Sequence, residues 1–204
     1  MATTSYHVPV LLEESLAHLE LRPGAVIVDG TLGGGGHAEA ILERTAPDGI
    51  LIGLDVDPDA LREAGRRLAP FGERVRLVQA SFRRLEDVAR DLRPIAIDGV
   101  LLDLGVSSHQ LDRPERGFRF SPGPESPLDM RMDHEGEGAT AAQLLATLSA
   151  ADLERLFSQY GQLPGARRLA RAIVERRSLL PLATAKDLIE LIEALGIGRG
   201  RQHN

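Results

Sequence analysis

Short apolar runs alternate with amphipathic segments along the first half of the chain. The apolar runs are rich in aliphatic and β-branched residues and predict four strands, at residues 25–29, 50–55, 75–79 and 100–104. Apolar residues recur at helical spacing between these runs, and Asp57 followed by Pro58 is typical of a helix start. Strand–helix alternation of this kind predicts an α/β fold, with a parallel sheet that carries helices on both faces.

The second half of the chain has a different pattern. Residues 106–138 are rich in Gly, Pro, Asp and Arg and show no period, which predicts a long loop. From about residue 139 onward the pattern is helical. Ser149 and Thr184 each precede an Asp by three residues, as in a capping box, and Gly196 is a plausible helix stop.

Composition narrows the class of protein. Apolar residues make up 43% of the 204 residues and charged residues 26%, which is ordinary for a globular protein. The absence of cysteine excludes disulfides and cysteine–zinc sites, and we predict no metal site. Glu13 and Glu14 interrupt the first apolar segment, so we expect a cytoplasmic protein without a signal peptide or membrane span.

Charge is unevenly distributed along the chain. The formal net charge is −6, which does not by itself indicate a nucleic-acid-binding protein. Residues 161–204, however, contain eight Lys or Arg against four Asp or Glu, a local charge of +4. A basic face of this kind is able to hold a phosphate backbone.

A glycine run between the first strand and the following helix is the strongest functional signal. Residues 29–37 read Asp-Gly-Thr-Leu-Gly-Gly-Gly-Gly-His. Strand, glycine turn and helix form the geometry in which backbone N–H groups close around a ligand, and glycines remove the β-carbons from its approach. The alternative is a flexible surface loop. The surrounding strand and helix favour a site for a nucleotide-like cofactor.

Two acidic residues discriminate between cofactors. Gly33-x-Gly35-x-x-Ala38 fits the dinucleotide fingerprint, and Asp55 at the end of the next strand is placed to accept ribose hydroxyls, unless it is a solvated strand-end charge. Asp29 would repel a pyrophosphate but attract the sulfonium and amino groups of S-adenosylmethionine. Its alternative role is to hold the glycine turn. S-adenosylmethionine is therefore the better fit.

Asp103 and Phe82 are further candidates at the same edge of the sheet. Asp103 ends the fourth predicted strand, where it would hold the cofactor, accept a hydrogen bond from a substrate amine, or cap the next turn. Ser107 and Ser108 follow as weaker candidates. Phe82 comes just after the third strand, where it would lie against an adenine ring or belong to the core.

Several strings together resemble the ribosomal small-subunit RNA cytosine-N4 methyltransferase family (RsmH, also called MraW). The resemblance covers nearly the whole chain in order. Its strings are His7-x-Pro9-Val10-Leu11-Leu12, Asp29-Gly30-Thr31 with Gly33-x-Gly35-Gly36-His37, Leu101-Leu102-Asp103-Leu104-Gly105-Val106-Ser107-Ser108, Arg116-Gly117-Phe118, Pro127-Leu128-Asp129-Met130-Arg131-Met132 and Ala170-Arg171-Ala172-Ile173-Val174-Glu175.

This resemblance implies a Rossmann-like class I methyltransferase with a helical insertion. Residues 1–138 would then form the cofactor-binding domain and residues 139–204 a substrate-binding helical insertion. The implied reaction is methylation of N4 of a cytidine in small-subunit ribosomal RNA, with the RNA or the ribosomal subunit as partner. By the same resemblance S-adenosylmethionine would be contacted by Gly35, Gly36, His37, Asp55, Phe82, Asp103 and Gln110.

Methyl transfer to an exocyclic amine requires an acceptor for the amine hydrogens, and Asp103 is the catalytic candidate. Amino methyltransferases often carry an Asp/Asn-Pro-Pro-aromatic motif at this position, whereas this chain has Asp103-Leu104-Gly105-Val106.

Phe118 and Phe120 would stack on a splayed base or pack in the core. His7 and His109 have no assigned role. Arginines that would contact RNA phosphates, or form ordinary ion pairs, are Arg113, Arg116, Arg119, Arg131, Arg167, Arg168, Arg171, Arg176 and Arg177.

Residues 100–104 are too apolar for an exposed sheet edge, and no strand is predicted after the helical region. We therefore expect a partial sequence with an incomplete sheet, and self-association through the open edge. Two other classes stay open: a non-catalytic RNA-binding or assembly protein with a vestigial cofactor pocket, and an NAD-dependent oxidoreductase. Asp29 and the missing second nucleotide-binding half count against the oxidoreductase.

Overall fold

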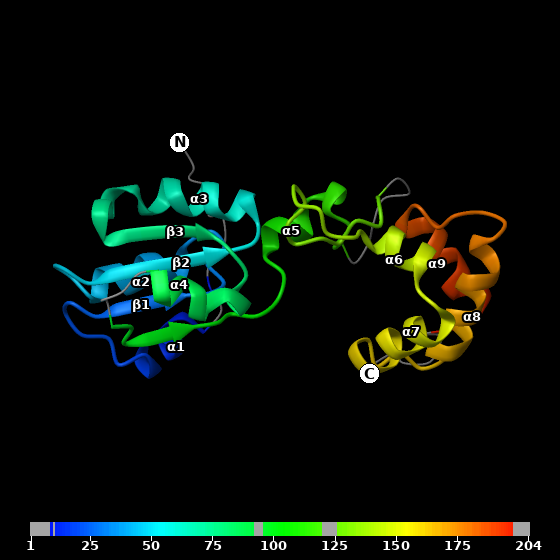
Figure 1. Cartoon of the computed structure of the whole chain (residues 1–204), viewed down its shortest axis with the longest axis horizontal. Helices are drawn as coiled ribbons and strands as arrows, with labels where there is room; N and C mark the ends of the chain where they lie inside the picture. The colour runs from blue at the N-terminus through cyan, green and yellow to red at the C-terminus, as the bar shows by residue number, and fades with distance from the viewer. Residues whose placement is uncertain (1–8, 10, 92–95, 120–125, 198–204) are drawn as a thin grey trace. The chain divides into compact units, whose positions relative to one another are not determined.

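A computed structural model describes residues 9, 11–91, 96–119 and 126–197. Contacts between residues divide the chain into two compact units, Met1–His109 and Gln110–Asn204. Figure 1 shows a sheet with its helices in the first unit and a group of helices in the second. His7 and Phe120 lie outside the described residues.

The first unit is built on a parallel four-stranded sheet, which confirms the predicted α/β fold. The strand order is β3-β2-β1-β4 and every neighbouring pair is parallel. The strands are β1 (Val26–Asp29), β2 (Ile50–Asp55), β3 (Val75–Gln79) and β4 (Gly99–Leu101). The helices are α1 (Leu12–His18), α2 (Gly36–Arg44), α3 (Pro58–Leu68) and α4 (Leu85–Asp91), with 3₁₀ turns at Ala69–Arg74 (η1) and Phe82–Arg84 (η2).

Both faces of the central strands are covered. Ile27 and Leu51 pack in one buried cluster with residues of α1, α2 and α3. Val28 and Ile52 point to the other face, into a cluster that Leu85 of α4 also joins. The alternation of these side chains explains why β1 and β2 are apolar at nearly every position.

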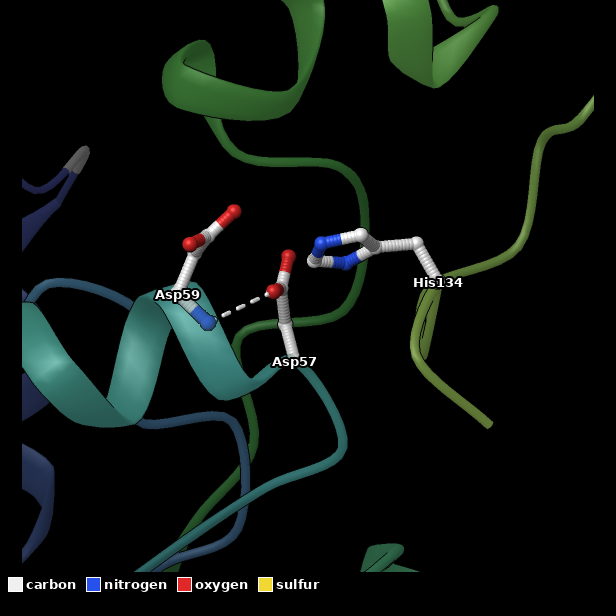
Figure 2. A group of neighbouring side chains, drawn as sticks. All are labelled: Asp57, Asp59 and His134. Carbon is white, nitrogen blue, oxygen red and sulfur yellow. Dashed lines mark hydrogen bonds between the residues drawn. The ribbon is translucent and has the colours of Figure 1, made fainter.

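The helix after β2 begins as the sequence predicts. The Asp57 carboxylate accepts a hydrogen bond from the backbone N–H of Asp59, at 3.0 Å, and Pro58 occupies the first helical position (Figure 2). The Asp57 side chain is buried. This cap fixes the start of α3 directly behind the carboxyl end of β2.

The fourth strand is shorter than predicted. It ends at Leu101, where the register with Asp29 of β1 also ends, and residues 102–104 lie outside it. The backbone N–H of Asp103 donates to the Thr31 hydroxyl, at 2.6 Å, so residue 103 stays beside the turn after β1 although it lies outside the ladder. Within the described residues no strand pairs with the outer side of β4, and Val100 and Leu102 are 41% and 45% exposed.

The second unit consists of helices packed around their own apolar core. After α5 (Ser108–Asp112) and a 3₁₀ turn at Pro114–Arg116 (η3) come α6 (Ala141–Thr147), α7 (Ala150–Arg155), a π-helical turn at Leu156–Tyr160 (η4), α8 (Ala166–Arg177) and α9 (Ala185–Ala194). Thr184 forms the predicted capping box with Asp187, and Ser149 accepts from the N–H of Asp152. Buried core residues include Leu128, Leu145, Leu153, Leu169, Ile173 and Leu182.

Part of the predicted long loop is tied to these helices. Arg116 is 3% exposed, and its guanidinium donates to the backbone carbonyls of Arg131 and Met132. The N–H of Leu128 donates to the carbonyl of Ala183. The two units divide between His109 and Gln110, whereas the sequence resemblance implied a cofactor-binding domain that extends to residue 138.

The same contacts bear on two of the arginine interpretations. Arg116 is buried on carbonyl oxygens, which favours a structural role for it. Arg131 donates to both oxygens of Asp129, which holds the pKa of that carboxyl below its usual range.

Among the residues described, no helix is both long enough and apolar enough to cross a bilayer.

Candidate functional site

The glycine turn lies at the carboxyl edge of the sheet, between β1 and α2. Gly35 is the N-cap of α2 and has a φ of 80°, in the left-handed region that favours glycine. A β-carbon at Gly35 would also lie 3.3 Å from the Cβ of Ala64 on α3. The N–H of Gly35 donates to the carbonyl of Leu32 and closes the turn.

Glycines along this turn serve different purposes. A β-carbon at Gly30 would lie 2.5 Å from Leu102, and one at Gly36 would lie 2.6 Å from Pro9, so these two glycines make room for the protein's own side chains. At Gly33 a β-carbon would meet nothing closer than the Thr31 carbonyl, at 3.9 Å. Gly33 is therefore the position where the backbone stays open to an approaching ligand.

Asp55, at the end of β2, holds the turn with both carboxylate oxygens. One oxygen accepts from the N–H of Gly33, at 2.8 Å, and the other from the N–H of Asp57, at 2.9 Å. Burial raises the pKa of Asp55, and the N–H donors of Asp57 and Gly33 oppose that rise. Each carboxylate oxygen has a second lone pair, so Asp55 is still able to accept from ligand hydroxyls.

Asp29, at the end of β1, is the most deeply buried acid of the site. It is 1% exposed and accepts one hydrogen bond from the N–H of Thr31, at 3.1 Å. Burial raises the pKa of Asp29 to about 7, and the negative charges of Asp55 and Asp103 contribute to the rise. The hydrogen bond shows that Asp29 holds the turn, which was the structural alternative for this residue, and its charge lies next to the other two acids.

Thr31 connects the turn to the loop after β4, a role that the sequence reasoning missed. Its N–H donates to Asp29 and its hydroxyl accepts from the N–H of Asp103. The available signal was a hydroxyl residue directly after Asp-Gly at a strand end, a pattern that favours side-chain to backbone hydrogen bonds. The Asp103 carboxylate is about half exposed and lies 4.0 Å from Nδ1 of the buried His37.

The predicted contact residues divide between the two units. Gly35, Gly36, His37, Asp55 and Asp103 lie on the turn or on the strand ends and loop that it contacts. Phe82 begins η2 beside Gly30, with 37% of its surface exposed, so it is not a fully buried core residue. Gln110 is buried on α5 and belongs to the second unit, and its role stays a prediction.

The site combines open backbone with a concentration of negative charge. The negative charges of Asp55 and Asp103 act on Asp29, beside a turn that leads into a helix. Three carboxylates would repel a pyrophosphate lying against this turn, whereas they stabilise a ligand that carries positive charge. The negative charge of the site therefore fits a cationic nucleoside better than a dinucleotide.

Comparison with known proteins identifies a family. The model of the MraW methylase family matches residues 4–202 of the chain. Proteins named ribosomal RNA small subunit methyltransferase H are similar to it: that of Geotalea daltonii is 54% identical over 188 residues, covering 92% of this chain and 59% of the relative. The protein from Heliobacterium mobile is 48% identical over 198 residues, covering 97% and 62%. The chain thus spans about 60% of the length of these relatives.

The buried position of Asp29 makes a prediction about pH and stability. Its pKa in the folded protein, about 7, lies above its ordinary value of 3.8, so ionising it destabilises the fold progressively as pH rises between these values. Complete ionisation of Asp29 lowers the free energy of unfolding by at most about 4 kcal/mol. Asp29→Asn keeps an oxygen that accepts from Thr31 and removes this cost. The melting temperature of the variant should exceed that of the wild type by a margin that grows between about pH 5 and pH 7 and is constant above.

Asp91→Asn, at an exposed acid on α4, is the matched control and should show no margin at any pH. Thermal unfolding of the three proteins across this pH range measures the effect. A margin for Asp29→Asn that does not change with pH would contradict the assignment.

Proposed function

The chain belongs to the MraW methylase family, and from this premise we propose that it transfers a methyl group from S-adenosylmethionine to N4 of a cytidine in small-subunit ribosomal RNA. The main observation in favour of S-adenosylmethionine as the cofactor is the group of three carboxylates around an open glycine turn. The names of the relatives support small-subunit ribosomal RNA as the substrate. The choice of N4 rests on the sequence resemblance and on the exposed acceptor Asp103.

Each site residue has a proposed contact to the cofactor. Asp55 would accept the ribose hydroxyls through its remaining lone pairs, and Phe82 would lie against the adenine ring. The backbone at Gly35, Gly36 and His37 would line the path of the ligand, while the charges of Asp29 and Asp103 would stabilise its sulfonium and amino groups. Gln110 would add a side-chain hydrogen bond.

Asp103 has the properties that the amine acceptor needs. S-adenosylmethionine supplies an electrophilic methyl group bonded to a positively charged sulfur. The lone pair of a cytosine amine is delocalised into the ring, so the enzyme has to orient the nitrogen and accept its hydrogen. The Asp103 carboxylate is half exposed, and its backbone is fixed by the Thr31 hydroxyl. It is therefore held in place and still accessible to a substrate.

One alternative stays open from the sequence: a non-catalytic RNA-binding or assembly protein with a vestigial cofactor pocket. Methyl transfer distinguishes it from an enzyme. The NAD-dependent oxidoreductase is weakened further, because three carboxylates now surround the turn that a pyrophosphate would occupy.

Transfer of labelled methyl tests the proposed function directly. The protein is mixed with methyl-labelled S-adenosylmethionine and small ribosomal subunits or their RNA, and the RNA is digested to nucleosides. We expect label in N4-methylcytidine. Asp103→Asn should lower the rate by about 100-fold or more, because it removes the acceptor of the amine hydrogen. Calorimetry should show no binding of NAD, and a loss of affinity for S-adenosylmethionine in Asp103→Asn that is much smaller than the loss of rate, because the charge of Asp103 contributes to cofactor binding as well.

Two outcomes contradict the proposal. Binding of S-adenosylmethionine without transfer to either form of the RNA would favour the non-catalytic alternative. Binding of NAD in preference to S-adenosylmethionine would favour the oxidoreductase. If Asp103→Asn loses cofactor affinity by the same factor as it loses rate, Asp103 acts only as a cofactor contact and is not the acceptor of the amine hydrogen.

We also propose that β4 pairs with a second copy of the chain. Val100, Leu102 and Leu104 are 41%, 45% and 67% exposed along or just after this edge, and exposed apolar edges promote strand pairing. Light scattering after size exclusion should show a dimer whose fraction rises with concentration. Val100→Lys should give monomers, whereas Leu179→Lys, at an exposed apolar residue of the second unit, should not. A monomeric wild type at all concentrations would refute this pairing.

A further inference from the structure

Helix α8 carries positive charge in its first turn, where a helix least tolerates it. Ala166 is its first residue, and Arg167 and Arg168 follow in a first turn that contains no acidic residue. Backbone N–H groups make this end of a helix electropositive, so cations there are unfavourable. Arg171 lies four residues after Arg167, a spacing at which like charges repel. The arrangement opposes helix stability unless an anion is bound.

The other three arginines of α8 have structural partners. Arg176 pairs with Asp187, at 3.7 Å, and Arg177 donates to the carbonyls of Leu145 and Leu148. Arg168 donates to the carbonyl of Leu195, at the end of α9. These bonds join α8 to neighbouring elements, which accounts for the three residues without a ligand.

Arg167 and Arg171 differ from them. Both are exposed, and within the described part of the chain neither forms an ion pair or a side-chain hydrogen bond. The opposite face of α8 provides the core residues Leu169, Ala170 and Ile173, so the two arginines point away from the core. Nothing in the packing of this unit requires a guanidinium group at either position.

The two arginines border an open hollow of about 430 Å³ on the surface of the second unit. Ala172 and Leu195 contribute apolar surface to it, and Gly165, the N-cap of α8, lies at one end. Glu175 also lines the hollow, but it is not within ion-pair distance of Arg171. The hollow therefore offers cationic groups beside apolar surface, a combination that suits the phosphates and sugars of a nucleic acid strand.

We propose that this face of α8 binds the substrate RNA, with Arg167 and Arg171 each contacting a backbone phosphate. The proposal rests on the proposed function and adds the RNA-binding surface to it. Four residues of a helix rise by about 6 Å, so the two guanidinium groups are able to face separate phosphates on one strand. Arginine binds phosphate oxygens through paired N–H donors, and such contacts fix the register of the RNA without reading its sequence.

Salt-dependent binding tests this surface. Binding of a fluorescein-labelled fragment of small-subunit ribosomal RNA is measured by anisotropy over a range of salt concentrations, for the wild type, Arg167→Gln/Arg171→Gln and Arg155→Gln. Arg155 is an exposed arginine of α7 in the same unit, paired with Asp152, and serves as the matched control. Loss of two phosphate contacts should reduce the slope of log K against log salt by about 1.4 to 1.8 and weaken binding about tenfold.

The control variant should keep the wild-type slope and affinity, and all three proteins should share one affinity for S-adenosylmethionine. The double variant should melt no lower than the wild type, because it loses unfavourable charge at the start of α8. A double variant whose slope and affinity equal those of Arg155→Gln would overturn the proposal. So would displacement of the RNA by polyglutamate at equal charge concentration, because the surface would then bind acidic peptides.

The test separates this surface from the proposed function. If the wild type binds RNA through these arginines but transfers no methyl group, the binding surface stands and the methyltransferase assignment fails. If methyl transfer occurs and the double variant behaves as the control does, only the binding surface fails.

Discussion

Burial of the Asp29 carboxylate beside two other acids, Asp55 and Asp103, is the constraint on which the glycine turn depends. These acids lie where β1, β2 and the loop after β4 reach the same edge of the sheet. Backbone donors offset part of the cost of burying the acids: Thr31 donates to Asp29, and Gly33 donates to Asp55. The shape of the glycine turn follows from these bonds, because each of them fixes one of its residues against a strand end.

These backbone donors offset only part of the cost of burying the acids, and the cost that remains favours a positively charged ligand. Burial keeps the pKa of Asp29 near 7, so much of its charge is unfavourable in the protein alone. A positively charged ligand would relieve this cost on binding. Helix α8 has the opposite charge, since Arg167 lies in its first turn, where a helix disfavours a cation, and Arg171 lies one turn further on. The proposed cofactor is positively charged and the proposed RNA strand is negatively charged, so each would match the charge of its site.

Local patterns predicted much of the fold because local physics determines it. The runs at β2 and β3 and the Asp57-Pro58 helix start were predicted at their observed positions. The end of β4 was missed, because Leu102 and Leu104 continue the apolar pattern past the last residue that pairs with β1. The partners of Arg116 were not predicted, because its carbonyl acceptors become neighbours only when residues 131 and 132 fold back on it.

The same distinction applies to the site. The ends of β1 and β2 gave Asp29 and Asp55 from sequence alone, since parallel strands end at one edge. The sequence did not show why glycine is needed at each position of the turn, because the side chains that crowd Gly30 and Gly36 belong to residues 102 and 9. Only Gly33 among these three keeps the open backbone that the run of glycines suggested.

The most direct test compares the affinities of S-adenosylmethionine and S-adenosylhomocysteine across pH. The two ligands share every group except the charged sulfonium, so their affinity ratio reports the charge at the turn. The account predicts that S-adenosylmethionine gains about three- to tenfold over S-adenosylhomocysteine between about pH 5.5 and pH 7.5, as Asp29 ionises. Asp29→Asn should abolish this gain. A ratio that stays constant with pH in the wild type would contradict the central claim.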